Sequence, residues 1–335
     1  MGFIDLPNEL LLQIIQNLGD RDPIYAIARV NRRLYVLARE PLLRFNVRHE
    51  GSSALRWAVQ VGRVNVVRDL LRLGAVVDTR AGENPKNLTP LHVAAKHGHV
   101  QIIDILLEHG ARYRARAIHG QRPIFGALVS GHETVAAYLF AQGSTRDRKA
   151  IISTTPVGFN ALHVACHYER MSFIQEYIDV REDVDARTAN RSTALHIVVE
   201  KHLQGQRVLD RHSEAAYARC SNIVKMLRML LQAGAHPNSI RGDGVAPLYI
   251  VLSKHLHGQN LVVQGFPVED AKCDNVLSTV KLLLEFGADP NIVGPPVGFR
   301  PSRSAGEVGS EHPDAAIRSL FRKYKSSAGR KPFRV

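Results

Sequence analysis

Apolar residues between positions 3 and 43 recur at helical spacing and outnumber what so short a segment can bury. From Leu10 to Leu18 they fall at i, i+1, i+4, i+5 and i+8, which places them on one face of a helix. Asp22-Pro23 and Asn31 then start two further helices with apolar residues behind them. A segment of roughly 40 residues rarely encloses that many apolar side chains. We therefore expect three helices whose surplus apolar face contacts something outside the segment.

Downstream, the hydrophobic pattern repeats with a period of about 33 residues. In the clearest copy the run from Thr89 to His92 reads TPLH, a pair of alanines follows, and the copy closes at Gly110. The small alanines let one helix approach its neighbour, and the glycine suits a left-handed helix end. We predict six copies, which begin near residues 51, 87, 120, 158, 190 and 242.

The last two copies are longer than the others. The signature leucine precedes the closing glycine by 19 residues in the copy from Leu91 to Gly110, but by 39 in the copies that contain Leu195 and Leu248. Each of these therefore carries an insert of 20 residues between its two helices, at about 202–221 and 255–274. Because adjacent repeats stack in parallel, we expect the two inserts to lie side by side.

The repeat, with its Thr-Pro-Leu-His signature, resembles the ankyrin repeat. The N-terminal segment, with Leu6-Pro7-x-Glu9, paired apolar residues and Val30-x-Arg32-Arg33-Leu34, resembles the F-box. These resemblances imply an all-α fold, in which a short three-helix F-box-like domain (1–48) precedes an ankyrin-repeat α-solenoid (51–293) of helix-turn-helix repeats with β-hairpin fingers. The Gly-, Pro-, Ser- and Arg-rich stretches of the basic tail (294–335) indicate partial disorder around an amphipathic helix at 314–324, which we expect to cap the solenoid.

The F-box resemblance implies a partner, the linker subunit of an SCF-type cullin-RING ubiquitin ligase. The chain would then be a substrate adaptor, with the chemistry left to its partners, and no cofactor is implied. Carried over onto this sequence, the residues that contact the linker subunit are Leu6, Pro7, Leu10, Ile14 and Ile15, with Val30 and Leu34 in support. In a rival interpretation the chain is an ankyrin scaffold, and its three helices hide their apolar face against the first repeat.

Charge adds a prediction about the substrate. The formal net charge is +13, and basic residues gather in the fingers, the segments that follow each Gly-Ala. Guanidinium groups suit carboxylates and phosphates, so we expect a groove for an acidic or phosphorylated protein segment; the alternative is solvated charge on the finger tips. The groove candidates are Arg112, Arg114, Arg116, Arg122, Arg146, Arg148 and Lys149. Few aromatic residues accompany them, which disfavours nucleic acid as the ligand.

Other chemistry finds little support in the sequence. It contains no GxSxG, HExxH or phosphate-cradling Gly-rich motif, so we predict no enzyme. His97, His99 and the His163–His167 segment coincide with repeat positions, which disfavours a metal site. Three scattered cysteines, no signal peptide and no long apolar run predict an intracellular protein of the cytoplasm or nucleus, without a membrane partner.

Overall fold

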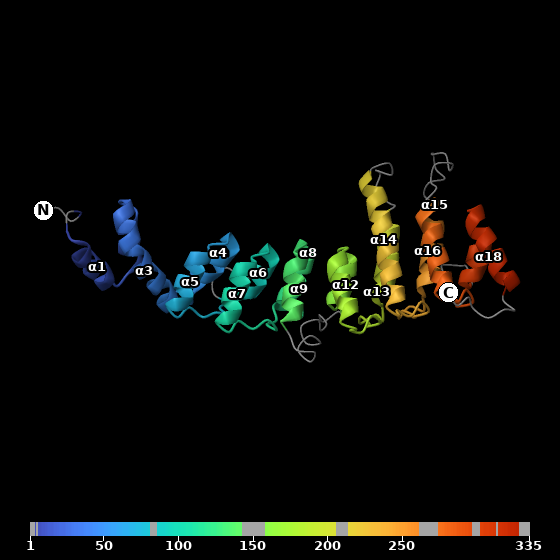
Figure 1. The fold of residues 1–335 in the computed structure, drawn as a ribbon, viewed down its shortest axis with the longest axis horizontal. Coiled ribbons are helices and arrows are strands. Elements are labelled where there is room, and N and C mark those ends of the chain that lie inside the picture. The colour runs from blue at the N-terminus through green and yellow to red at the C-terminus, as the bar shows by residue number, and fades with distance from the viewer. Residues whose placement is uncertain are drawn as a thin grey trace. The chain divides into compact units, whose positions relative to one another are not determined.

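The computed structural model describes residues 4, 6–80, 86–142, 158–205, 214–260, 274–296, 302–312 and 314–327. Over these residues the protein is helical (Figure 1). Its one β-type contact there is an isolated bridge between Val293 and Ser304. The chain divides into two compact units, residues 1–151 and 152–335, and each is described by itself.

The first unit begins with three helices: α1 (Asn8–Asn17), α2 (Arg21–Ala28) and α3 (Arg32–His49). Both α1 and α2 pack against α3. The Asn31 side chain accepts a 2.8 Å hydrogen bond from the Leu34 amide and so caps α3, as its residue type predicts. The helices enclose a small core of Ile15, Ile24, Ala28 and Ala38.

Helix α3 continues past this core and contacts the first repeat, packing against both α4 (Ser53–Val61) and α5 (Val64–Arg72). The Asn46 side chain, which is almost fully buried, accepts a 3.0 Å hydrogen bond from the Ala54 amide and donates to Ser53 Oγ at 2.9 Å. One helix therefore belongs to both the N-terminal domain and the repeats of the first unit.

The helix pairs of the first unit stack in the order of the chain. First helices pack on first helices, from α4 to α6 to α8, and α5 packs on α7. In α6 the signature forms a capping box, in which the His92 ring and the Thr89 side chain satisfy amides at the helix start. The glycine after α6 adopts φ +75°, and a Cβ there would lie 2.6 Å from the His132 ring. These further helices are α6 (Pro90–His97), α7 (Val100–Glu108), α8 (Pro123–Ser130) and α9 (Glu133–Ala141).

The second unit has the same pairing, with longer helices where the inserts fall. Helices α13 and α14 have 12 and 19 residues, against eight and nine in α6 and α7. Helix α13 packs on α15, and α14 packs on α16 (Figure 1). Residues 206–213 and 261–273 of the inserts lie outside the described residues. The helices are α11 (Ala161–His167), α12 (Met171–Asp179), α13 (Ala194–Gly205), α14 (Glu214–Gln232), α15 (Pro247–Asn260) and α16 (Asp274–Glu285).

The second unit ends in a helix pair, α17 (Ala305–Ser310) and α18 (Ala315–Ser327), where the sequence predicts one capping helix after a mobile stretch. The capping box of α17 explains its order: Ser304 Oγ accepts from the Glu307 amide at 3.2 Å, and Glu307 Oε2 accepts from the Ser304 amide at 2.7 Å. Helix α17 packs on α15, and α18 packs on α16. The pair therefore occupies the place of a further repeat.

The fingers differ from the β-hairpins that the ankyrin resemblance implies. Within the described residues they are closed by tight turns: the Ala115 amide donates to the Arg112 carbonyl at 2.8 Å, and the Ala117 amide donates to the Gln121 carbonyl at 2.8 Å. The bond between Ala117 and Gln121 has counterparts in the second unit, where the Thr188 amide donates to the Ser192 carbonyl at 2.9 Å and the Arg241 amide donates to the Val245 carbonyl at 3.1 Å. Each of these described fingers therefore has a defined backbone without strand pairing.

Candidate functional site

The N-terminal domain leaves an unusual number of large apolar side chains in contact with solvent. Seven lie between residues 4 and 36, among them Leu10 at 46% exposure and Ile14 at 39%. These two are one turn apart on α1, so they share a face. We call the seven residues the exposed apolar set: Ile4, Leu10, Ile14, Tyr25, Val30, Tyr35 and Val36.

The predicted linker-contacting residues divide between the interior and the surface of this domain. Leu10, Ile14 and Val30 are exposed, as is Pro7, and Leu6 is half-buried. Two others are fully buried, because Ile15 on α1 and Leu34 on α3 point into the domain. These two hold the helices together. Ile15 offers no surface to a partner, so its predicted contact is corrected, whereas the predicted role of Leu34 was only a supporting one.

A role for Arg33 was missed at the sequence level. Its guanidinium donates from Nε to Asn8 Oδ1 at 2.7 Å, from Nη1 to the Ile4 carbonyl at 2.8 Å, and from Nη2 to the Leu6 carbonyl at 2.6 Å. These three bonds tie the segment before α1 to α3 and fix the backbone of Ile4. The sequence signal was the Arg32-Arg33 pair itself, but its bonding partners lie 25 to 29 residues away and follow only from the packing.

The fingers of the first unit form a shallow depression of about 760 Å³. Four arginines line it: Arg80 from the first finger, and Arg112, Arg114 and Arg116 from the second. All four are exposed. We call them the arginine cluster. Three of the groove candidates are thus brought together, and Arg80 joins them as a residue that the sequence analysis did not select.

Arg122 is a different kind of residue from the cluster. Its side chain is only 5% exposed, and Nη1 donates to the Arg114 carbonyl at 2.7 Å. Burial lowers the pKa of the Arg122 guanidinium, and the charges of Arg116 and Arg114 add to this effect. Arg122 supports the second finger from inside, so it is removed from the groove candidates. Arg146, Arg148 and Lys149 lie outside the described residues.

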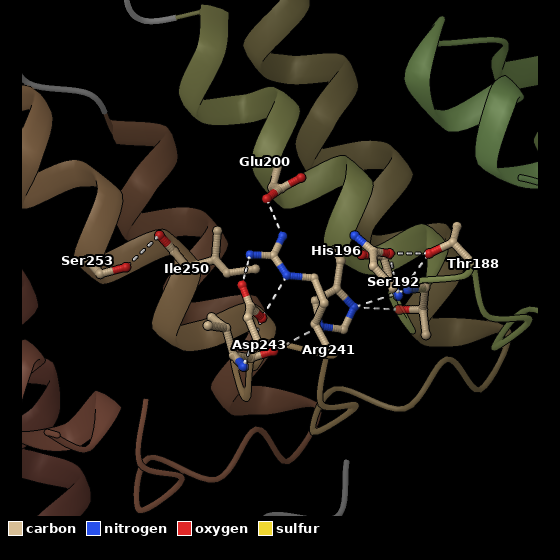
Figure 2. A network of polar contacts seen from close by, with 11 residues as sticks. Thr188, Ser192, His196, Glu200, Arg241, Asp243, Ile250 and Ser253 are labelled. Atoms are coloured by element: carbon tan, nitrogen blue, oxygen red, sulfur yellow. Dashed lines mark hydrogen bonds and ion pairs between the residues drawn. The ribbon is translucent and has the colours of Figure 1, made fainter. Parts of the chain in front are cut away.

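In the second unit, Arg241 likewise proves to be an internal link (Figure 2). It is paired with Glu200 of α13 at 2.5 Å and with Asp243 of its own finger at 2.5 Å. The hydrogen bond from Arg241 lowers the pKa of Asp243. Beside it, His196 contacts Thr193 Oγ1 at 2.9 Å and the Val245 carbonyl at 3.2 Å, and burial lowers its pKa. This network joins neighbouring repeats.

The described residues give little support for a nucleophile, a metal site or a membrane-spanning helix. Cys166 is fully buried, and burial raises the pKa of its thiol, which opposes a nucleophilic role. Among the described residues, no group of three or more His, Cys, Asp or Glu side chains is arranged to hold a metal ion. In the same part of the chain, no helix has the length and apolar content needed to cross a membrane.

Comparisons with known proteins match both parts of the chain. The family model for an F-box-like domain matches residues 3–49, and that for ankyrin repeats matches residues 77–150. Domains of both kinds are typically non-catalytic interaction modules. A putative palmitoyltransferase ZDHHC13 of Danio rerio is 32% identical over 250 residues, which are 73% of this chain and 35% of that protein. The NF-kappa-B inhibitor zeta of Mus musculus is 24% identical over 278 residues, which are 71% of this chain and 35% of that protein. The chain thus spans about a third of the length of these relatives.

Solved structures support the fold of the repeats. The ankyrin repeat domain of Bcl-3 aligns with a TM-score of 0.60 at 21% identity, covering 82% of this chain and all of that domain. The ankyrin repeat domain of human ASB11 aligns with a TM-score of 0.53 at 19% identity, covering 81% of this chain and 97% of that domain. At such identities the likeness concerns the fold alone. Together, the family matches, the helix pairs and their capping boxes show that this chain carries an F-box-like domain at residues 3–49, followed by ankyrin repeats that the family model matches at residues 77–150.

Proposed function

We propose that this protein is a non-enzymatic substrate adaptor of an SCF-type cullin-RING ubiquitin ligase. In this proposal the F-box-like domain binds the linker subunit of the ligase, and the ankyrin repeats hold a protein substrate. The protein would act inside the cell, in the cytoplasm or nucleus, where such ligases operate. The observation that carries the proposal is the exposed apolar set of the F-box-like domain.

Covering these side chains is favourable enough to support binding. Burying a large apolar side chain fully contributes about 2 kcal/mol, and members of the exposed apolar set are roughly half exposed. Each therefore retains about 1 kcal/mol of unrealised burial, which a complementary partner recovers on binding. Arg33 supports the same surface, since it fixes the segment that carries Ile4.

The exposure of these residues also favours the adaptor over the rival scaffold. A solenoid cap would hide its apolar face against the first repeat, whereas here α3 alone supplies the main packing against α4 and α5. Leu10 and Ile14 of α1 stay in contact with solvent. A cap function would leave that exposure unexplained, because exposed apolar clusters are typical of protein–protein interfaces.

Assembly with the ligase tests the proposal. The full chain is mixed with a purified linker–cullin–RING complex and analysed by size-exclusion chromatography. We expect co-elution, and we expect its loss in a variant lacking residues 1–48 and in L10D/I14D. A matched control, V61D/V76D, introduces two aspartates at apolar residues of similar exposure (48% and 60%) outside the F-box-like domain and should co-elute. If the unmodified chain elutes separately from the complex, the scaffold interpretation replaces the adaptor.

A further inference from the structure

The arginine cluster lies where two successive fingers of the first unit meet. Arg80 belongs to the first finger, and Arg112, Arg114 and Arg116 belong to the second. The single acid among the residues that line the depression is Asp78. Four guanidinium groups against one carboxylate leave the depression with a surplus of three positive charges.

The carboxylate of Asp78 has a structural task. It accepts a 3.3 Å hydrogen bond from the Arg112 amide and so connects the first finger to the second. The same link recurs in the second unit, where Asp185 accepts from the His236 amide at 3.0 Å and Asn238 accepts from the Asp289 amide at 2.7 Å. An acceptor at this finger position therefore ties one finger to the next.

Arg114 occupies this position in the second finger, three residues after Ala111, as Asp78 stands three residues after Ala75. A guanidinium has five donors and no acceptor, so Arg114 is unable to accept the bond that the position supports elsewhere. Arg114 thus stands where the other fingers carry an acceptor, Asp or Asn, and it places a positive charge in the depression. We take this as a sign that Arg114 serves binding.

The backbone that carries the cluster is held in place before any ligand arrives. Arg122 donates to the Arg114 carbonyl at 2.7 Å, and Arg80 donates to the Arg116 carbonyl at 3.0 Å. The Ala115 amide closes the turn at the Arg112 carbonyl. A pre-organised loop loses less conformational entropy when it binds, so charge pairing there yields more affinity than on a mobile tip.

From these observations we propose that the arginine cluster binds an acidic peptide segment, through guanidinium pairing with carboxylate or phosphate groups. The assignment to a ligase substrate rests on the proposed function, but the binding chemistry does not. A nucleic acid fits the depression less well, since stacking platforms need several aromatic side chains. Tyr113 is the one aromatic residue in the lining, and it is half-buried with the Arg114 guanidinium 5.5 Å from its ring centre.

Fluorescence anisotropy on the full chain tests the proposal with four labelled probes. These are a peptide of alternating Glu and Ser, the same peptide with phosphoserine, a neutral Gln–Ser peptide, and a single-stranded oligonucleotide. We expect the two acidic peptides to bind at least tenfold more tightly than the neutral one, and the tighter of the two identifies carboxylate or phosphate as the preferred group. The variant R112Q/R114Q/R116Q should lose at least tenfold in affinity.

A matched control distinguishes binding by the arginine cluster from the effect of lowering the net charge of the chain. R63Q/R68Q/R72Q removes three exposed arginines around α5 and should bind within about twofold of the unmodified chain if local pairing dominates. Equal losses in the two triple variants would overturn the proposal. Binding of the neutral peptide as tightly as the acidic ones would overturn it too, as would tighter binding of the oligonucleotide through the same arginines.

A second variant addresses folding, since Arg114→Asn restores an acceptor at the linking position. It should unfold at the same temperature or higher, yet bind the acidic peptides more weakly. A fall in both properties would contradict a binding role for Arg114. Linker binding is measured on the same preparations of the unmodified chain: if that chain binds the linker subunit but shows no preference for the acidic peptides, this inference alone is refuted. The reverse result refutes the proposed ligase function alone.

Discussion

Acidification should destabilise the repeats through their signature histidines. His92 and His163 are 3% and 1% exposed, and burial lowers the pKa of each from 6.5 to about 4. Each ring nitrogen Nδ1 accepts from an amide at the start of its helix, the Thr89 amide at 3.3 Å and the Asn160 amide at 3.2 Å. Protonation removes that acceptor and places a charge in the interior, so the folded state resists protonation.

The magnitude follows from the two pKa values. Below pH 6.5 the unfolded chain binds protons that the folded chain does not, so stability falls as the pH falls and the loss levels off below about pH 4. Between pH 7.4 and pH 5 each histidine should cost about 2 kcal/mol, and the pair should cost about 4 kcal/mol. The free energy of unfolding is measured by urea titration followed by circular dichroism across this range.

The matched control is H92Q/H163Q. Glutamine at the third position of a capping box can satisfy the same amide without titrating in this range. The double variant should therefore lose about 4 kcal/mol less than the unmodified chain between pH 7.4 and pH 5. The claim that His92 and His163 cause the loss of stability would be refuted if the free energy of unfolding of both proteins had the same pH dependence. A gain in stability of the unmodified chain on acidification would refute it too.

Three further predictions follow from single contacts. Arg33→Ala should speed amide hydrogen exchange over residues 4–8 and weaken linker binding, since three hydrogen bonds to that segment are lost. Unchanged exchange would contradict the role of Arg33 in fixing this segment. Arg241→Ala should lower the free energy of unfolding by about 2 kcal/mol because it removes the ion pairs of Arg241 with Glu200 and Asp243, and the effect should fade at low pH as those carboxylates become protonated. Gly309→Ala should cost about 1–3 kcal/mol, because a Cβ there would lie 2.3 Å from the Phe321 ring, while Gly19→Ala, with nothing within 4 Å, should be nearly neutral.

Much of the helical architecture could be predicted from local signals. The cap at Asn31 and the capping box from Thr89 to His92 hydrogen-bond to backbone groups at most three residues away, so a short stretch of sequence is enough to predict them. Helix α17 was missed because a composition rich in Gly, Pro and Ser suggested mobility. Ser304 and Glu307 carry the capping signal within that composition, and Gly306 and Gly309 are buried, with the Gly309 backbone close to the Phe321 ring.

The candidate site was harder to predict, because the direction of a long side chain depends on neighbours distant in sequence. Arg122 and Arg114 belong to one finger, yet the first is buried against a carbonyl and the second is exposed. Arg80 was overlooked because its neighbours in the cluster belong to the following repeat. Ile15 and Leu34 fit the F-box pattern, but the pattern does not separate the residues that build the domain from those that contact a partner.

Calorimetric titration of the full chain with the purified linker subunit tests the central claim most directly. The account predicts saturable binding to the unmodified chain, at least a hundredfold weaker binding by L10D/I14D, and unchanged binding by V61D/V76D. Equal affinity for L10D/I14D and the unmodified chain, or no binding by the unmodified chain, would contradict the claim that these exposed apolar residues form the ligase interface.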